Sequence, residues 1–367
     1  MTEPSITGIK RLFCNPQNAQ VNLLLNSMKQ DLQQVKDEQA LYRLMRPALS
    51  FKGKIGYNNT LQWWLVALGA LMLLLFYGID QGMPTVELLP AWAAEPVWHL
   101  LRFIYDLPFG PWSSGALLIA IGLLVIIKRR SRLKGLTQAI WQKNLLLDNQ
   151  LTQVNTNPDA QADSYKARFH EFHRGNHRQS IDYLCRGHYP GEQHQFDFEA
   201  FDFHYVDKHT TTTTDSKGRS STRTTYTHYH RYGVILPFGY VKDLSVLGYS
   251  SSGHRGTKWQ PASLDFRRAY TARATSEMTA ARFFKPAVVE ILLHLKDQLR
   301  QVNLEFNSAG DLCITIADND LLSTPCPVAL DEPQQLLKVL KEETRLEKLD
   351  ALLHTAHQLM VYNDNNF

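Results

Sequence analysis

The stretch FGPWSSGALLIAIGLLVII, residues 109–127, runs for 19 residues without a charged side chain and then meets Lys128, Arg129 and Arg130. At 1.5 Å per residue a helix of this length reaches about 28 Å, close to the ~30 Å hydrocarbon core of a bilayer. A basic cluster directly after an apolar run suits the headgroup region of a membrane. The stretch therefore predicts a transmembrane helix that ends at these basic residues.

A second apolar stretch, LQWWLVALGALMLLLFYGI, occupies residues 61–79 and is also free of charge. Trp63, Trp64 and Tyr77 lie near its ends, where amphipathic rings prefer the membrane interface. The alternative, a buried core helix, rarely runs this long without a charged residue. The two stretches predict a two-helix membrane hairpin over residues 61–127, with a connecting loop at 80–108.

Charge predicts the orientation of this hairpin. Residues 1–60 carry eight Lys or Arg, whereas the loop 80–108 carries Arg102 against four acidic residues. The positive-inside rule then places both termini in the cytoplasm of a bacterial inner membrane and the loop outside. The polar first 50 residues lack the apolar core of a signal peptide, so we expect the spans themselves to direct insertion.

Composition limits the classes of function. A net charge of +4 over 367 residues does not suggest a nucleic-acid-binding protein, which usually concentrates basic residues on one face. The four cysteines are scattered without a CxxC pair, which favours free thiols in a reducing compartment.

The soluble parts predict an α+β protein, in which a cytoplasmic domain with an antiparallel sheet and packed helices is attached to the membrane hairpin. We expect a cytoplasmic N-terminal helical segment over residues 1–60, with one polar helix at 18–46. A juxtamembrane helix and polar linker follow over 128–164, then the α+β domain over 165–330 and C-terminal helices over 331–367. Within the domain, residues 240–247 and 264–274 predict strands, and 279–301 predicts a helix that Pro286 begins or divides.

A long hairpin is the most distinctive prediction. Strands at 195–214 and 221–236 flank the turn 215–218, and Thr residues fill both strands toward the turn. Thr favours strands, but a Thr-rich tip has little apolar surface to bury. We therefore expect the tip to project into solvent or onto a partner.

Histidines suggest candidate metal ligands. His204, His228 and His230 fall on facing strands of the predicted hairpin and form one candidate set, with cross-strand polar and aromatic pairing as the alternative. His170, His173 and His177 have helical spacing, but Gly175 weakens a helix there and we expect a basic, partly exposed helix instead. The sequence contains no GxSxG, HExxH or phosphate-loop pattern, so it assigns no catalytic or cofactor-binding residue.

Three segments resemble a known family: DSKGRSSTRTTYTHYHRYGVIL at 215–236, AARFFKPAVVEILLHL at 280–295 and LEFNSAGDLCITIAD at 304–318. The order of these segments and their residues resemble a bacterial membrane-protein family of unknown function that is sometimes labelled galanin-like. Ala281, Arg282 and Pro286 match the start of the family's helix, whereas Lys285 replaces the usual Thr. The resemblance covers about residues 130–325. It implies two spans with a cytoplasmic domain and a LemA-type membrane protein as partner, and it carries over no catalytic residue.

Three functions fit these features. The first is an inner-membrane-anchored scaffold or adaptor whose cytoplasmic domain binds protein or lipid, without catalysis. The second is a metal-dependent, membrane-anchored enzyme that uses the His-rich hairpin. The third is a subunit of an oligomeric channel or transporter, although spans without ionisable residues offer no ion path unless many copies assemble. The expected partners are the lipid bilayer, a protein partner and further copies of the chain.

Overall fold

The computed structural model describes residues 15–81, 90, 95, 99, 103, 110–214, 219–249 and 253–364. The chain has a mixed α+β fold and divides into two compact units. The helical unit comprises Met1–Trp141 and Cys326–Glu342, and the sheet unit comprises Gln142–Pro325 and Glu343–Phe367.

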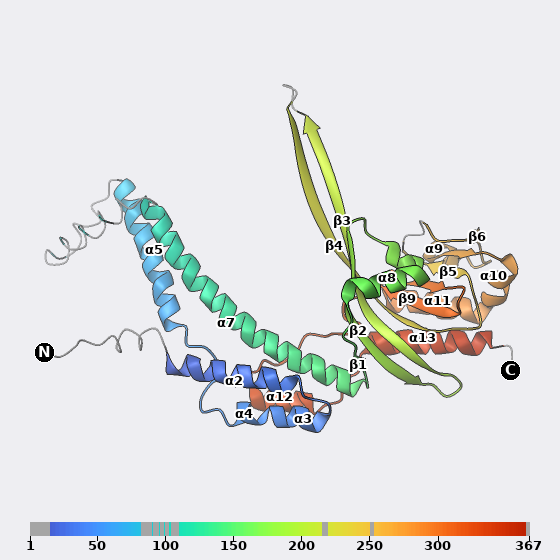
Figure 1. Ribbon diagram of the computed structural model, residues 1–367, viewed down its shortest axis with the longest axis horizontal. Helices are drawn as coiled ribbons and strands as arrows, with labels where there is room; N and C mark the ends of the chain where they lie inside the picture. Colours follow the sequence, from blue (N-terminus) through green and yellow to red (C-terminus); the bar gives the residue numbers. More distant parts are fainter. Residues whose placement is uncertain are drawn as a thin grey trace. The chain divides into compact units, whose positions relative to one another are not determined.

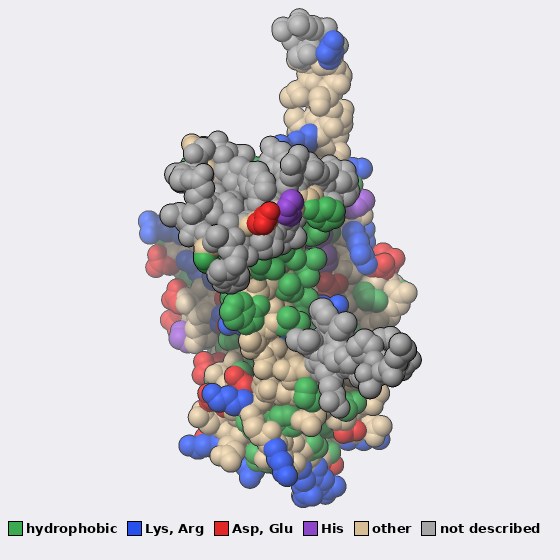
Figure 2. Space-filling view, turned by 90° about the vertical axis from the view of Figure 1, so that its left-hand side faces the viewer, with side chains coloured by type: hydrophobic (Ala, Val, Ile, Leu, Met, Phe, Trp, Pro, Cys, Tyr) green, Lys and Arg blue, Asp and Glu red, His purple; other side chains and the backbone are tan. Residues whose placement is uncertain are grey.

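Two helices are long and apolar enough to cross a membrane, α5 (Thr60–Asp80) and α7 (Gly110–Asp148) (Figure 1). Only 22% of the apolar stretch of α5 and 11% of that of α7 is buried within the protein, whereas a soluble core helix would be mostly buried. Figure 2 shows hydrophobic side chains gathered on this surface. Most of the predicted loop at 80–108 lies outside the described residues.

α5 and α7 approach each other closely at glycines. A Cβ atom built on Gly69 would lie 2.6 Å from the carbonyl oxygen of Gly115, and one on Gly122 would lie 2.7 Å from Cγ2 of Val66. Small residues permit such backbone contact, which drives helix association where lipid removes the hydrophobic effect. At the basic end, Arg129 donates to the side-chain oxygens of Asn59 and Gln62, both at 2.9 Å. The glycines and Arg129 therefore hold the two helices together.

α7 continues without a break beyond its apolar part, so the predicted juxtamembrane helix is the second half of the same helix. The single N-terminal helix predicted at 18–46 is wrong. It is instead three helices, because the chain turns after Leu32 and Asp37 accepts a 2.7 Å hydrogen bond from the Ala40 N–H to cap the next helix. These helices are α2 (Pro16–Leu32), α3 (Glu38–Leu44) and α4 (Arg46–Leu49).

The two C-terminal helices belong to different units. α12 (Pro333–Leu340) packs on α4 in the helical unit, and the Leu330 N–H ahead of it donates to Thr137 Oγ1 of α7 at 3.2 Å. α13 (Glu347–Asn363) packs on α11 (Pro286–Gln298) in the sheet unit. The two helices that follow residue 331 therefore do not form one module.

The described strands of the sheet unit form one antiparallel sheet of nine strands in the order β1-β2-β3-β4-β9-β8-β5-β7-β6. The two longest strands, β3 and β4, extend well beyond their neighbours (Figure 1). The strands are β1 (Thr152–Gln153), β2 (Arg178–Pro190), β3 (Gln195–Thr214), β4 (Ser220–Pro237), β5 (Leu244–Leu247), β6 (Thr257–Trp259), β7 (Thr271–Ala274), β8 (Asn303–Phe306) and β9 (Asp311–Ile316).

Helices cover both faces of this sheet. α8 (Pro158–Arg168) and the 3₁₀ helix η1 (His170–His173) cover one face, where the buried rings of Phe172 and Phe203 meet with centroids 4.9 Å apart. On the opposite face Phe283 of α10 (Glu277–Phe283) packs on Phe306 of β8 at 5.1 Å. Alternating strand side chains therefore enter two separate cores.

Three local predictions are corrected or resolved by the structure. Residues 264–269 form a helix, α9 (Leu264–Ala269), rather than the start of a strand, because the Ser263 hydroxyl caps it by accepting from the Phe266 N–H at 3.2 Å. The basic segment after residue 165 is not one helix: it passes from α8 through η1 into β2. Pro286 divides the predicted helix at 279–301 into α10 and α11.

Candidate functional site: the projecting hairpin

The β3–β4 hairpin extends beyond the strands on either side of it. β3 and β4 pair in continuous register from Glu199↔Ile235 to Thr214↔Ser220. β2 pairs with β3 only as far as Val206, and β9 pairs with β4 only from Tyr232 onward. Residues 207–214 of β3 and 220–231 of β4 therefore have no neighbouring strand on their outer edges within the described residues, and we call this part of the hairpin the ribbon.

The ribbon buries little apolar surface. Its strands from Lys208 to Thr214 and from Ser220 to Tyr226 are exposed throughout. Thr hydroxyls bridge the two strands, for example Thr212 Oγ1 and Thr222 Oγ1 at 3.3 Å. In Figure 2 the ribbon is a column of polar uncharged and basic side chains. The predicted projection of this hairpin is confirmed by the structure, although the turn 215–218 lies outside the described residues.

Hydrogen bonds at the foot of the ribbon show which backbone groups point outward. The His177 N–H donates to the Val206 carbonyl at 3.1 Å, on the side of β3 away from β4. Asn176 does the same two residues later: its Oδ1 accepts from the Lys208 N–H at 2.7 Å and its Nδ2 donates to the Lys208 carbonyl at 3.1 Å. Because hydrogen-bonding direction alternates along a strand, even-numbered ribbon residues direct their N–H and C=O groups outward.

The predicted metal candidates do meet, but as a stack of rings. His204 lies between His228 and His230, with centroids 5.1 and 4.7 Å away and interplanar angles of 12° and 15°. His204 Nε2 is 2.9 Å from His228 Nδ1, and His230 Nδ1 is 2.8 Å from Asp202 Oδ1. This is the cross-strand pairing that the sequence offered as the alternative.

The ring nitrogens of the stack have separate partners: His204 Nδ1 lies 3.4 Å from Asp182 Oδ2, whereas His230 Nδ1 faces Asp202. Among the described residues, no group of three or more His, Cys, Asp or Glu side chains is arranged to hold a metal ion. Burial lowers the pKa of His204, as do His230 and His228, while Asp182 raises it. Burial also raises the pKa of Asp202, opposed by His230. The second predicted set does not assemble: His170 and His173 stack at 5.1 Å in η1, while His177 contacts Tyr226.

A buried ionic network anchors the ribbon to the sheet. Arg231, at the end of the ribbon and 2% exposed, donates to Glu171 Oε1 at 3.1 Å and to Thr315 Oγ1 at 2.9 Å. Arg174 also donates to Glu171, at 2.7 Å. Burial opposes ionisation of Glu171, but the two guanidinium groups outweigh it and lower the pKa to about 2. η1 and the ribbon are thereby tied together.

Glu305 occupies a neighbouring polar cavity of about 210 Å³. Its carboxylate accepts hydrogen bonds from the backbone N–H groups of His170 at 2.6 Å and Glu171 at 3.0 Å. Burial nevertheless raises the pKa of Glu305 to about 7. The sequence did not single out Asn176, Glu171 or Glu305, since a lone polar residue signals a role only when its spatial neighbours are known.

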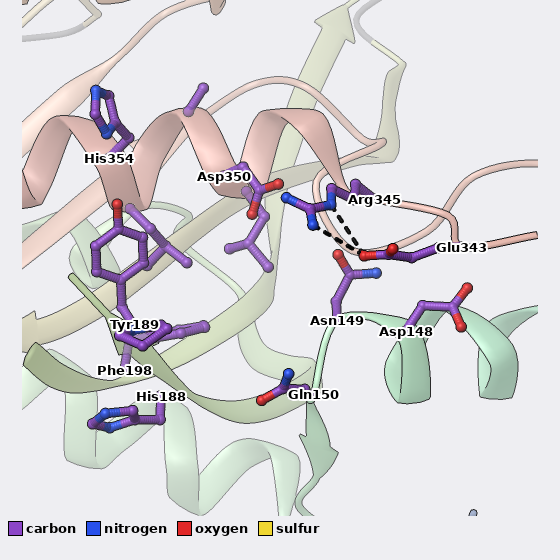
Figure 3. Close-up of a pocket in the computed structure, with 14 residues that line it drawn as sticks. Asp148, Asn149, Gln150, His188, Tyr189, Phe198, Glu343, Arg345, Asp350 and His354 are labelled. Atoms are coloured by element: carbon purple, nitrogen blue, oxygen red, sulfur yellow. Dashed lines mark hydrogen bonds and ion pairs between the residues drawn. The ribbon is translucent and has the colours of Figure 1, made fainter. Parts of the chain in front are cut away.

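A larger cavity of about 610 Å³ lies between α13 and the ends of α7 and β2 (Figure 3). Arg345 donates to Glu343 at 3.1 Å at one end, and Asp350 lies beside them on α13. His188, Tyr189 and His354 line the other end. Burial raises the pKa of Asp350, and Arg345 lowers it. The cavity combines carboxylates, a guanidinium group and aromatic rings.

Comparisons of the chain with protein families, with curated proteins and with solved structures give no match. The geometry itself offers a long exposed ribbon, a buried network that holds it in place, and a polar cavity around Glu305 next to that network. Such an arrangement suits binding, because the ribbon is exposed and its base is tied into the sheet by buried hydrogen bonds.

Proposed function

We propose that this protein is a membrane-anchored adaptor, in which α5 and α7 lie in the bilayer and the sheet unit binds a protein partner on one side of it. The observation that carries the proposal is the ribbon, whose two strands extend beyond the sheet (Figure 1) with exposed polar side chains and, within the described residues, no strand beside the β4 edge. These exposed residues do not pack in the core, so we attribute the length of the two strands to binding.

The membrane is the bacterial inner membrane in this proposal, and the sheet unit is cytoplasmic. The basic residues that follow the apolar part of α7, Lys128 to Arg130, support that side under the positive-inside rule. A tag after Phe367 tests it: in intact cells the tag should be shielded from a membrane-impermeant reagent and become reactive only after permeabilisation. Labelling in intact cells would reverse the orientation.

The resemblance of residues 215–236, 280–295 and 304–318 to the galanin-like family suggests the partner. In that family the implied partner is a LemA-type membrane protein, and we propose the same class here. Lys285 departs from the family pattern but lies at the start of α11, away from the ribbon, where its Nζ donates to the Tyr362 carbonyl at 2.6 Å.

Cross-linking in native membranes tests the adaptor function. Full-length chains carry a photo-reactive side chain at Tyr226 on the ribbon or, as a control, at exposed Arg267 on α9. We expect a discrete product of one partner mass from position 226 and none from 267. Absence of any product from 226, from 267 and from the cavity residue His354 would argue against an adaptor.

A further inference from the structure

We propose that the free edge of β4, residues 220–230, accepts an additional β-strand from an extended segment of a partner that carries carboxylates. The inference rests on the adaptor function proposed above and specifies how the partner is held. Strand addition requires backbone N–H and C=O groups that are free along β4. It also requires that the β4 edge be more accessible than the β3 edge, and that the charges of ribbon and partner be complementary.

The alternation of hydrogen-bonding direction along the hairpin shows which backbone groups of β4 have no partner on β3. Val206 and Lys208 direct their backbone groups away from β4, so their register partners on β4, His228 and Tyr226, direct theirs away from β3. The same phase continues along β4. The outward-facing positions are Ser220, Thr222, Thr224, Tyr226, His228 and His230.

β9 shows where an added strand would lie. It pairs with β4 from Pro237 to Tyr232 and ends at Ile316, after which the Ala317 N–H bonds the Arg300 carbonyl and the chain leaves the sheet. Within the described residues no strand continues this line along residues 220–231 of β4. The unpaired edge over residues 220–230 is about 36 Å long at ~3.3 Å per residue, which is enough for a complete partner strand.

The opposite edge of the ribbon is less suitable. On β3 the side-chain amide of Asn176 already occupies both backbone groups of Lys208, as a neighbouring strand would. Only Thr210, Thr212 and Thr214 remain as outward positions there. Proteins usually protect long edges with Pro, bulges or covering elements. β4 has continuous register with β3 and no Pro before Pro237, so its edge lacks both a bulge and a proline that would block an added strand.

The charge of the ribbon indicates which kind of partner segment would bind it. Residues 207–230, from the start of the ribbon on β3 to His230, contain four Lys or Arg and two Asp. Arg223 is exposed in the middle of the open edge. Cross-strand pairs of opposite charge stabilise a sheet, whereas like charges directly opposite destabilise it. An acidic extended segment therefore fits, and a second copy of the ribbon brings like charges together.

Hydrogen exchange tests the inference on the full-length protein in nanodiscs of neutral lipid. The probe is a ten-residue peptide of alternating Val and Glu at millimolar concentration, with an alternating Val and Lys peptide as its control. We expect the amides of Ser220, Thr222, Thr224 and Tyr226 to exchange at least tenfold more slowly with the Val-Glu peptide only. Equal slowing by both peptides, or by neither, overturns the inference.

Two other occupants would show themselves in the same measurement. Slowing that appears without peptide and increases with protein concentration identifies a second copy of the chain on this edge. Slowing produced by vesicles of anionic phosphatidylglycerol, and not by the Val-Glu peptide, identifies a lipid surface. Either result overturns the proposal of an acidic strand.

Matched substitutions locate the edge. Thr224→Pro removes an outward N–H from β4 and Thr212→Pro removes one from β3, while bonds inside the ribbon come from odd-numbered residues and stay in place. We expect Thr224→Pro to weaken peptide binding at least tenfold and Thr212→Pro less than twofold. If Thr224→Pro unfolds the ribbon, seen as loss of protection at Arg223 and Thr225, then Arg223→Glu against Arg267→Glu decides: only the first should weaken binding.

The two proposals fail in different ways. If position 226 cross-links a membrane partner equally well with Thr224→Pro and without it, the adaptor function stands and strand addition is wrong. If the peptide binds but no described position cross-links a partner in native membranes, the edge is competent and the adaptor function is wrong.

Discussion

The side-chain amide of Asn176 pairs with both backbone groups of Lys208, accepting from its N–H at 2.7 Å and donating to its carbonyl at 3.1 Å. One side chain thus stands in for a strand that β2 does not supply at this point, since β2 ends its pairing at Val206. The contact marks where the sheet stops and the ribbon begins.

Asn176→Ala should loosen the foot of the ribbon. It removes two hydrogen bonds at the edge, each worth about 1 kcal/mol, so the Lys208 amide should exchange roughly tenfold faster or more. Hydrogen exchange of the full-length chain measures this, with exposed Thr210→Ala as the control. Unchanged exchange at Lys208 would show that the amide pair contributes nothing to order there.

Arg231→Met should destabilise the sheet unit strongly. The substitution leaves the buried Glu171 carboxylate with Arg174 and Asn303 alone, and breaking a buried pair costs about 3–5 kcal/mol. Arg345→Met is the control, because its pair with Glu343 is exposed and worth less than about 1 kcal/mol. Denaturant unfolding compares the two, and Arg231→Met combined with Glu171→Gln should recover part of the loss. Equal effects of the two Arg substitutions would contradict the proposed role of the network.

Glu305 should make stability depend on pH. Its pKa is raised to about 7 by burial, so the folded protein binds a proton more tightly than the unfolded chain does. The stabilisation is complete below pH ~4.5 and is lost as pH rises to about 7, an effect on the order of 3 kcal/mol.

Glu305→Gln should remove that slope, and Glu290→Gln, on the exposed face of α11, should keep it. The measurement is denaturant unfolding of the full-length protein at pH 5 and pH 7.5. A slope that persists in Glu305→Gln would assign it to another group.

Gly122→Leu should separate α5 from α7. A Cβ at this position would lie 2.7 Å from Val66 Cγ2 and 2.9 Å from the Gln62 carbonyl, so a backbone atom would have to move. Gly135→Leu is the matched control on the same helix, since a Cβ there meets nothing within 4 Å. The melting temperature in detergent should fall for Gly122→Leu only. A fall of the same size for Gly135→Leu would point to helix propensity or surface hydrophobicity instead.

His204, the middle ring of the histidine stack, should resist protonation. The pKa of His204 is lowered by burial and by His230 and His228, so the stability that it contributes is present above pH 6.5 and is lost as pH falls below that value. Histidine NMR should show His204 titrating below 6.5. Asp182→Asn should lower its pKa further, because Asp182 favours the charged form. A pKa above 6.5 would mean that the carboxylates outweigh burial.

Some predicted elements needed only local information. The turn at 215–218 and the Thr-rich strands around it predicted a hairpin that the structure reproduces within about one residue, from Thr214 to Ser220. Residues 264–269 were predicted as strand and form α9, because the cap at Ser263 outweighs the strand preference of its neighbours. The three His candidates were placed together correctly by alternation along the strands, whereas the orientation of their rings depends on Asp182 and Asp202, which alternation does not reveal.

By itself the sequence determined the two long apolar helices, the α+β class and the projecting hairpin, since each follows from the length, charge or periodicity of a continuous segment. Only the tertiary structure decided that Asn176 pairs with the Lys208 backbone, that Glu171 is buried between Arg174 and Arg231, and that burial raises the pKa of Glu305 to about 7. These properties arise between residues distant in sequence, because burial and hydrogen bonding depend on which groups folding brings together.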